Sequence, residues 1–154
     1  MAKFPTTVEE SVTVGASMEK IYGFLWDVVG SSRCIPDIEH CRSVGADTYE
    51  FLYKPHSTGP VSMVVRYTAR YQGNGTDQIR FQSITAAEDN TDVDGVMTLK
   101  NKGPGTTLTL KQMLAPDTPV PRLLQSLIRS FVEAETSKAV KDFLLNVRQT
   151  IEKS

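Results

Sequence analysis

The sequence predicts an α+β protein in which an antiparallel sheet of about six to seven strands wraps around one long C-terminal helix. Two observations carry this prediction. From Arg122 onward the chain runs for about 30 residues without glycine or proline and shows the apolar period of a helix. Residues 40–114 alternate apolar and polar side chains between turn signals, which is typical of consecutive strands.

The N-terminal part of the chain predicts one strand followed by two short helices. Valines at alternate positions place the strand at residues 7–14. Ser17 then offers an N-cap for a helix over residues 18–29, whose apolar residues recur every three or four positions. A second helical turn is expected at 32–35, and Pro36 ends it.

The middle of the chain predicts a meander of strands. Each is bounded by glycine, proline, asparagine or aspartate, and they are expected at residues 40–44, 48–54, 61–71, 78–86, 92–101 and 106–114. Strands joined by tight turns without intervening helices must pair antiparallel. Residues 55–60 are expected to form a loop, and three prolines in 115–121 are expected to prevent either strand or helix there.

The predicted C-terminal helix carries two apolar stripes. The first consists of Leu124, Leu127, Ile128 and Phe131. The second consists of Ala139, Val140, Phe143, Val147 and Ile151. At about 100° per residue the second stripe is rotated by about 100° from the first. The two ends of the helix are therefore expected to pack against different neighbours, or the helix bends.

Composition limits the classes of function. The chain has 154 residues, of which 40% are hydrophobic and 23% charged, as expected for one globular domain over residues 1–154. The net charge of −1 gives no basic excess, so no nucleic-acid partner is expected. Because no apolar run approaches about 18 residues and no signal peptide precedes the domain, we expect a soluble cytoplasmic protein without stable membrane insertion.

Motifs for metal, phosphate or nucleophilic chemistry do not stand out. Cys34 and Cys41 are expected to be free thiols, although a disulfide between them stays open. His40 and His56 lack the spacing of a zinc site and the setting of a nucleophile's base. No metal, no cofactor and no catalytic residue is therefore assigned, and an enzyme is not favoured.

The order and spacing of the elements also match a known architecture. The residues that carry the match are Val12-Thr13-Val14 with Ser17, Trp26-Asp27, Ile35-Pro36-Asp37, Gly59-Pro60-Val61-Ser62-Met63, Gly105-Thr106-Thr107-Leu108 and Phe143. In these the chain resembles the START/Bet v 1-like (SRPBCC) helix-grip superfamily, and within it the branch of polyketide-cyclase-like proteins and carbon-monoxide-dehydrogenase accessory proteins. The resemblance implies a deep cavity beneath the final helix that admits lipids, sterols, quinones or polyketides.

Nine residues are expected to line that cavity: Tyr53, Met63, Val65, Tyr67, Phe81, Met97, Ile128, Phe131 and Glu135. Each tyrosine offers an apolar ring and one hydroxyl, which suits an amphipathic ligand, but aromatic residues also simply favour strands. Glu135 could bind a ligand's polar head or transfer a proton. Alternatively it lies at the cavity rim, paired with an arginine such as Arg66 from the sheet, whereas Arg66 on a solvated face is the simpler expectation.

The first hypothesis for function is binding or carriage of an apolar or amphipathic small molecule, such as a lipid, a quinone or a polyketide-like compound. The alternatives are a cyclase or dehydratase that uses Glu135 or a tyrosine as acid or base, and an accessory factor for assembling a larger enzyme. The expected partner is the hydrophobic ligand. The oligomeric state stays open, with a homodimer as one option.

Overall fold

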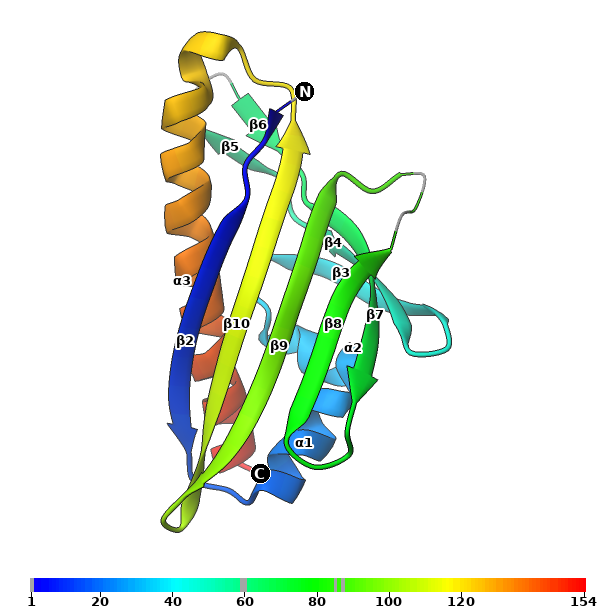
Figure 1. The fold of residues 1–154 in the computed structure, drawn as a ribbon, viewed down its shortest axis with the longest axis vertical. Coiled ribbons are helices and arrows are strands. Elements are labelled where there is room, and N and C mark those ends of the chain that lie inside the picture. Colours follow the sequence, from blue (N-terminus) through cyan, green and yellow to red (C-terminus); the bar gives the residue numbers. More distant parts are fainter. Residues whose placement is uncertain (1, 59–60, 85, 87) are drawn as a thin grey trace.

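A computed structural model describes residues 2–58, 61–84, 86 and 88–154. Figure 1 shows a large twisted sheet with one long helix running beside its strands. The helical elements are α1 (Met18–Trp26), α2 (Val28–Ser31), η1 (Ser32–Cys34), η2 (Arg122–Leu124) and α3 (Gln125–Glu152). The strands are β1 (Ala2–Lys3), β2 (Thr6–Val14), β3 (Ile38–Gly45), β4 (Thr48–Tyr53), β5 (His56–Thr58), β6 (Val61–Met63), β7 (Arg66–Gly73), β8 (Gln78–Ile84), β9 (Thr91–Lys102) and β10 (Gly105–Thr118).

The main sheet has eight strands in the order β1-β10-β9-β8-β7-β4-β3, with β2 also paired to β10. All its pairings are antiparallel, and β1 and β2 follow one another along the same edge of β10. β5 and β6 form a separate two-stranded sheet. The predicted α+β fold, an antiparallel sheet around a long C-terminal helix, is confirmed.

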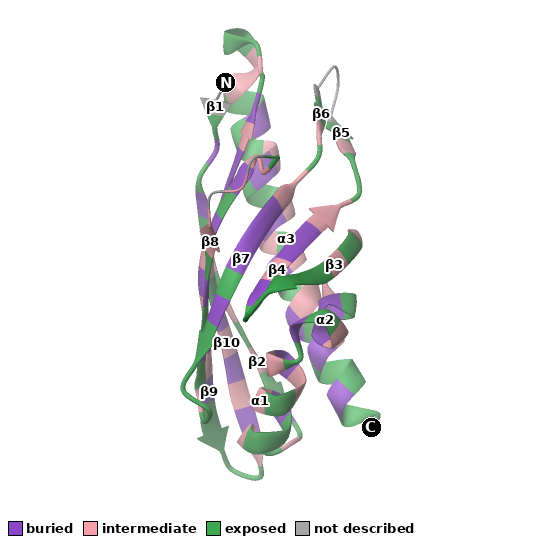
Figure 2. Ribbon diagram, turned by 90° about the vertical axis from the view of Figure 1, so that its right-hand side faces the viewer, coloured by how far each residue is buried: buried purple, intermediate pink, exposed green. Residues whose placement is uncertain are grey.

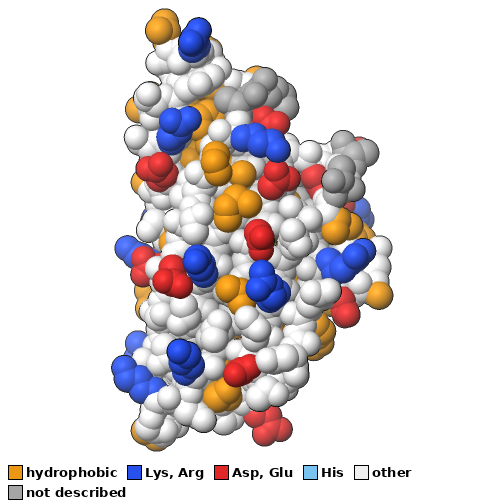
Figure 3. Space-filling model, viewed as in Figure 1, with side chains coloured by type: hydrophobic (Ala, Val, Ile, Leu, Met, Phe, Trp, Pro, Cys, Tyr) orange, Lys and Arg blue, Asp and Glu red, His pale blue; other side chains and the backbone are white. Residues whose placement is uncertain are grey.

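The core lies between the inner face of the sheet and α3, with α1 and α2 closing one end (Figure 2). Its main cluster includes Val14, Ile21, Leu25, Phe51, Tyr67, Leu108, Val140 and Leu144. A smaller cluster at the other end of α3 holds Phe4, Ile128 and Val132. On the outer face of the long strands, basic and acidic side chains are interspersed, so that face presents no field of one sign (Figure 3).

The buried face of α3 rotates along the helix, as the sequence predicts. Its members are Ile128, Val132, Thr136, Val140, Leu144, Val147 and Ile151. The first steps are four residues long, and each turns the face by about 40° at 100° per residue. One end therefore packs in the smaller cluster and the other in the main one. The predicted membership is partly wrong, because Leu127 is exposed, whereas Val132 and Leu144 are buried.

The predicted strand over residues 61–71 is wrong in one respect, because it breaks into β6 and β7. At the break the Asn90 side chain donates a hydrogen bond to the Val64 carbonyl and accepts one from the Arg66 N–H. The Tyr53 N–H donates to the Val65 carbonyl at 3.0 Å. The expected loop at 55–60 contains β5, which pairs with β6; Gly59 and Pro60 lie outside the described residues.

Proline does not end β10 where the sequence predicts, because the strand continues through Pro116 to Thr118. Pro116 stands opposite Thr91 in β9, and its carbonyl accepts a hydrogen bond from the Phe4 N–H at 3.0 Å. A proline is tolerated in a ladder where its nitrogen is not required as a donor. The expectation that residues 115–121 form neither element is therefore wrong for their first half.

The helical region after β2 also differs from the prediction. Ser17 is confirmed as the N-cap, since its hydroxyl accepts a hydrogen bond from the Lys20 N–H at 3.2 Å. The predicted helix over 18–29, however, ends at Trp26. The Asp27 carboxylate accepts from the Gly30 N–H at 3.2 Å and begins α2 as a separate helix.

Candidate functional site

A first cavity of about 100 Å³ lies under the middle of α3. It is lined by Pro36, Asp37, Tyr53, His56, Met63, Val65, Gln112, Leu114, Pro116, Phe131, Val132, Glu135, Thr136 and Ala139. These residues come from the turn before β3, from β4, from the β5–β6 hairpin with its exit, from β10 and from α3. The cavity therefore forms where the rotating face of α3 passes from one core cluster to the other.

A second cavity of about 70 Å³ adjoins the first along α3. Its lining is Ile35, Tyr53, Tyr67, Tyr71, Phe81, Met97, Leu110, Gln112, Ala139, Val140 and Phe143. Because Tyr53, Gln112 and Ala139 line both cavities, only these side chains need to shift for the two spaces to join.

The structure brings eight of the nine expected site residues to these walls. Tyr53 lines both cavities; the first also takes Met63, Val65, Phe131 and Glu135, and the second takes Tyr67, Phe81 and Met97. Ile128 is placed elsewhere. It is fully buried in the smaller cluster with Phe4 and Val132, because the first turns of α3 pack on the N-terminal segment rather than over the cavity.

Glu135 lies half-buried on the wall of the first cavity. Within the described structure its carboxylate forms no ion pair and no hydrogen bond. The alternative pairing with Arg66 is not formed, since Arg66 lies on the opposite face of the sheet and contacts Glu50 at 3.1 Å. Glu135 thus offers an unpaired carboxylate to whatever occupies this cavity.

Aromatic rings form a continuous row on the inner face of the sheet. Their centroids are 6.0 Å apart for Tyr53 and Tyr67, 4.9 Å for Phe51 and Tyr67, and 5.3 Å for Tyr71 and Phe81. The Tyr53 and Tyr67 hydroxyl oxygens are 3.0 Å apart and share a hydrogen bond. Burial raises the pKa of Tyr53 to about 12 and that of Tyr67 well above its ordinary value. Both hydroxyls therefore stay protonated at neutral pH.

Two polar residues that the sequence did not single out lie at the first cavity. His56 Nε2 is 3.4 Å from Asp37 Oδ2. Asp37 has a left-handed backbone with φ of 61°, and its carbonyl accepts a hydrogen bond from the Lys54 N–H at 2.8 Å. No local pattern could have paired these residues, because they belong to separate elements that only the fold brings together.

Gln112 is a third polar residue that sequence reasoning missed. It faces inward on β10 between Leu110 and Leu114, and it lines both cavities. Within the described structure its side-chain amide forms no hydrogen bond. A signal was present here, since a glutamine interrupts leucines at alternate positions of the strand. An amide without a protein partner on an apolar wall is available to a ligand.

Groups suited to other chemistry are not gathered at one place in the described part of the chain. Within it, no three His, Cys, Asp or Glu side chains are grouped to hold a metal ion. Cys34 and Cys41 are free thiols, as expected, and burial raises the pKa of Cys41 to about 11. Among the described helices, none is long and apolar enough to cross a membrane.

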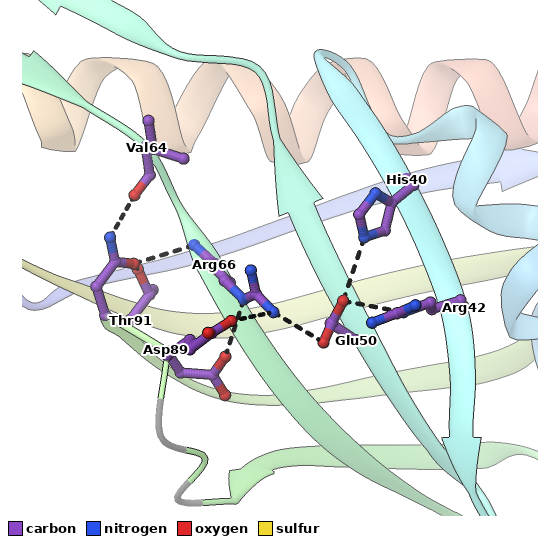
Figure 4. Close-up of polar contacts among 9 residues, drawn as sticks. His40, Arg42, Glu50, Val64, Arg66, Asp89 and Thr91 are labelled. Atoms are coloured by element: carbon purple, nitrogen blue, oxygen red, sulfur yellow. Dashed lines mark hydrogen bonds and ion pairs between the residues drawn. The ribbon is translucent and has the colours of Figure 1, made fainter.

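A polar network occupies the face of the sheet turned away from α3 (Figure 4). Glu50 on β4 is buried, and its carboxylate accepts hydrogen bonds from His40 at 3.2 Å and from Arg42 and Arg66 at 3.1 Å. Arg66 also contacts Glu88 at 3.1 Å. The hydrogen bond with His40 and the two arginines hold the pKa of Glu50 below its ordinary value.

Replacing Glu50 by glutamine is expected to lower the free energy of unfolding by about 1–3 kcal/mol at pH 7, because Arg66 loses a buried anionic partner. A lowered folded-state pKa stabilises the protein above the unfolded pKa, near 4.5, and this contribution is lost as pH falls through the folded pKa. Urea unfolding should therefore show the gap between wild type and Glu50→Gln closing below about pH 4.5.

The control is Glu88→Gln, which removes an exposed partner of the same arginine. Its stability should stay within about 0.5 kcal/mol of wild type at every pH. A gap between wild type and Glu50→Gln that is unchanged at low pH would contradict the assignment of this stability to the Glu50 carboxylate.

No protein-family model and no curated protein matches the sequence. Solved structures match the fold. The Zhui aromatase/cyclase of Streptomyces sp. R1128 aligns with a TM-score of 0.71 at 16% identity, over 97% of this chain and 94% of the other. A START superfamily protein of Mycobacterium smegmatis aligns with a TM-score of 0.69 at 17% identity, over 96% and 97%.

A STAR-related lipid transfer protein of Xanthomonas axonopodis aligns with a TM-score of 0.69 at 14% identity, over 95% of this chain and 85% of the other. The chain thus has the helix-grip fold that START-superfamily proteins and polyketide aromatase/cyclases share. The architecture expected from the order of its elements is confirmed.

Proposed function

We propose that this protein binds or carries an apolar or amphipathic small molecule in the two cavities beneath α3. The observation that carries the proposal is their shared wall, where Tyr53, Gln112 and Ala139 separate two spaces with largely apolar linings. Ligand sites in proteins typically combine an apolar lining with a few polar groups that orient the ligand. A lipid transfer protein among the structures with this fold supports the same interpretation.

The size of the cavities limits the ligand. At about 100 and 70 Å³ they are smaller than the roughly 300–1,000 Å³ typical of drug-sized ligands. An apolar cavity of about 150 Å³ is large enough for benzene. A ligand of one or two rings is therefore the best fit, and a larger one requires side chains to move. Met63 and Met97, one on each cavity, are suited to such repacking because their side chains are flexible.

The test is mass spectrometry of the organic extract of protein purified under native conditions. An unrelated protein purified from the same cells is the control. The expected result is an apolar compound in near-stoichiometric amount that the control lacks. An empty extract, together with no binding of small aromatic alcohols by calorimetry, would overturn the proposal.

A second candidate function is acid–base catalysis of the cyclase or dehydratase type. The observation that favours it is the His56–Asp37 pair at the same cavity as Glu135. A carboxylate that orients a histidine is a common arrangement for proton transfer. An aromatase/cyclase also has this fold. Turnover of the co-purifying compound that is lost in His56→Gln, with binding retained, would separate catalysis from carriage.

A further inference from the structure

The ionisable groups that line the cavities are unequal in sign. Asp37 and Glu135 contribute two carboxylates to the first cavity. Among the described residues that line either cavity, none is lysine or arginine, and the one basic side chain is His56. His56 already contacts the Asp37 carboxylate at 3.4 Å. A ligand in this space therefore meets hydrogen-bond acceptors and negative charge at its polar end.

The cations nearest in the fold are engaged elsewhere. Arg66 lies on the outer face of the sheet with Glu50 and Glu88. Lys141 on α3 contacts Glu10 of β2 at 3.8 Å. Lys138, one helical turn beyond Glu135, is exposed and forms no ion pair with it in the described structure.

The neutral polar groups lie deeper than the carboxylates. Gln112 and the hydroxyl of Tyr53 stand at the wall between the cavities, beside Ala139. Glu135 precedes Ala139 by one turn, which is about 6 Å along the helix axis. A ligand with its apolar body in the second cavity would thus place a polar group near Glu135 after a short spacer.

We infer that the cavities select neutral or cationic ligands whose polar group donates hydrogen bonds, and that they exclude carboxylates and phosphates. The inference rests on the proposed function and names its ligand class. An anion placed beside Glu135 and Asp37 gives up its hydration without gaining a cationic partner. A hydroxyl or ammonium group instead donates a charge-assisted hydrogen bond to a carboxylate. Amphipathic alcohols, phenols and amines fit these requirements, whereas fatty acids and phosphate esters do not.

The test compares three probes that share one apolar body: 2-naphthalenemethanol, 2-naphthalenemethylammonium and 2-naphthoate. Calorimetry with the full chain at neutral pH should show that the alcohol and the ammonium bind at least about tenfold more tightly than the carboxylate. Glu135→Gln removes the charge at nearly constant size. It should raise the affinity for 2-naphthoate about tenfold and lower that for the ammonium, with the alcohol changed by less than about threefold.

Glu133→Gln is the matched control, because it makes the same charge change at an exposed position of the same helix. It should leave the order of the three affinities unchanged. Glu135→Lys should make 2-naphthoate the preferred probe, and thermal melting checks that each variant is folded. If the carboxylate binds wild type as tightly as the alcohol, or if Glu135→Gln leaves the order unchanged, the inference fails while binding stands. If none of the three probes binds wild type, the proposed function fails, and the inference fails with it.

Discussion

Replacing Ala139 by phenylalanine is expected to abolish ligand binding while the protein remains folded. Ala139 lines both cavities, so a phenyl ring at this position occupies the space that a ligand would need. The cost of overpacking, about 1–3 kcal/mol in a filled core, should be smaller here because the ring enters existing space. Calorimetry with 2-naphthalenemethanol should show an affinity loss of more than about a hundredfold, equivalent to about 3 kcal/mol.

The control for this prediction is Ala134→Phe. Ala134 is exposed on the same helix and lines neither cavity of the described structure, so the same substitution should leave affinity unchanged. If Ala139→Phe retains wild-type affinity, the ligand does not occupy the space beneath α3, and the binding site must be sought on another surface.

The largest expected loss of stability follows from Leu144→Ala. Leu144 is 2% exposed and packs in the main core cluster. Removing a fully buried leucine side chain costs about 3–5 kcal/mol, because apolar contacts are lost and a cavity remains. Urea unfolding monitored by circular dichroism should show a lower midpoint with an unchanged denaturant slope.

The next residue provides the comparison. Leu145 is 46% exposed, and Leu145→Ala should change the free energy of unfolding by less than about 1 kcal/mol. Equal effects at the two positions would mean that the face of α3 assigned to the core is misplaced. The comparison tests the rotation of the helix directly, since adjacent residues point about 100° apart.

Predicting α3 from the sequence succeeds for the helix and fails for individual residues. The absence of glycine and proline and the two apolar stripes were visible in the chain. The choice between Leu127 and Val132, or between Phe143 and Leu144, was not, since all four are apolar. Only the neighbours supplied by β2, β10 and the N-terminal segment decide which of them is buried.

The strands show the same division between local pattern and long-range contact. Alternation predicted that residues 61–71 are extended, but it continues unbroken through Val64 and Val65. The break there depends on Asn90, which the fold brings across from the start of β9. A side chain distant in sequence therefore determines where β6 ends and β7 begins.

The candidate site was predictable where it is apolar and not where it is polar. Tyrosines and methionines at alternate strand positions indicated an inward-facing wall, and the structure places Tyr53, Met63 and Met97 there. Asp37 and His56 carried no such signal, because the first follows a proline in a turn and the second lay in an expected loop.

The pairing of β2 with β10 has a consequence for how the chain folds as it is synthesised. The register joins Val14 to Thr106 and Thr6 to Leu114, and the Gly15 N–H donates to Glu152 Oε2 at 2.7 Å. The first strand must therefore wait for nearly the entire polypeptide to leave the ribosome before it finds its partners. Such non-local contacts slow folding to roughly milliseconds to seconds and leave the apolar face of the sheet uncovered until the last helix docks.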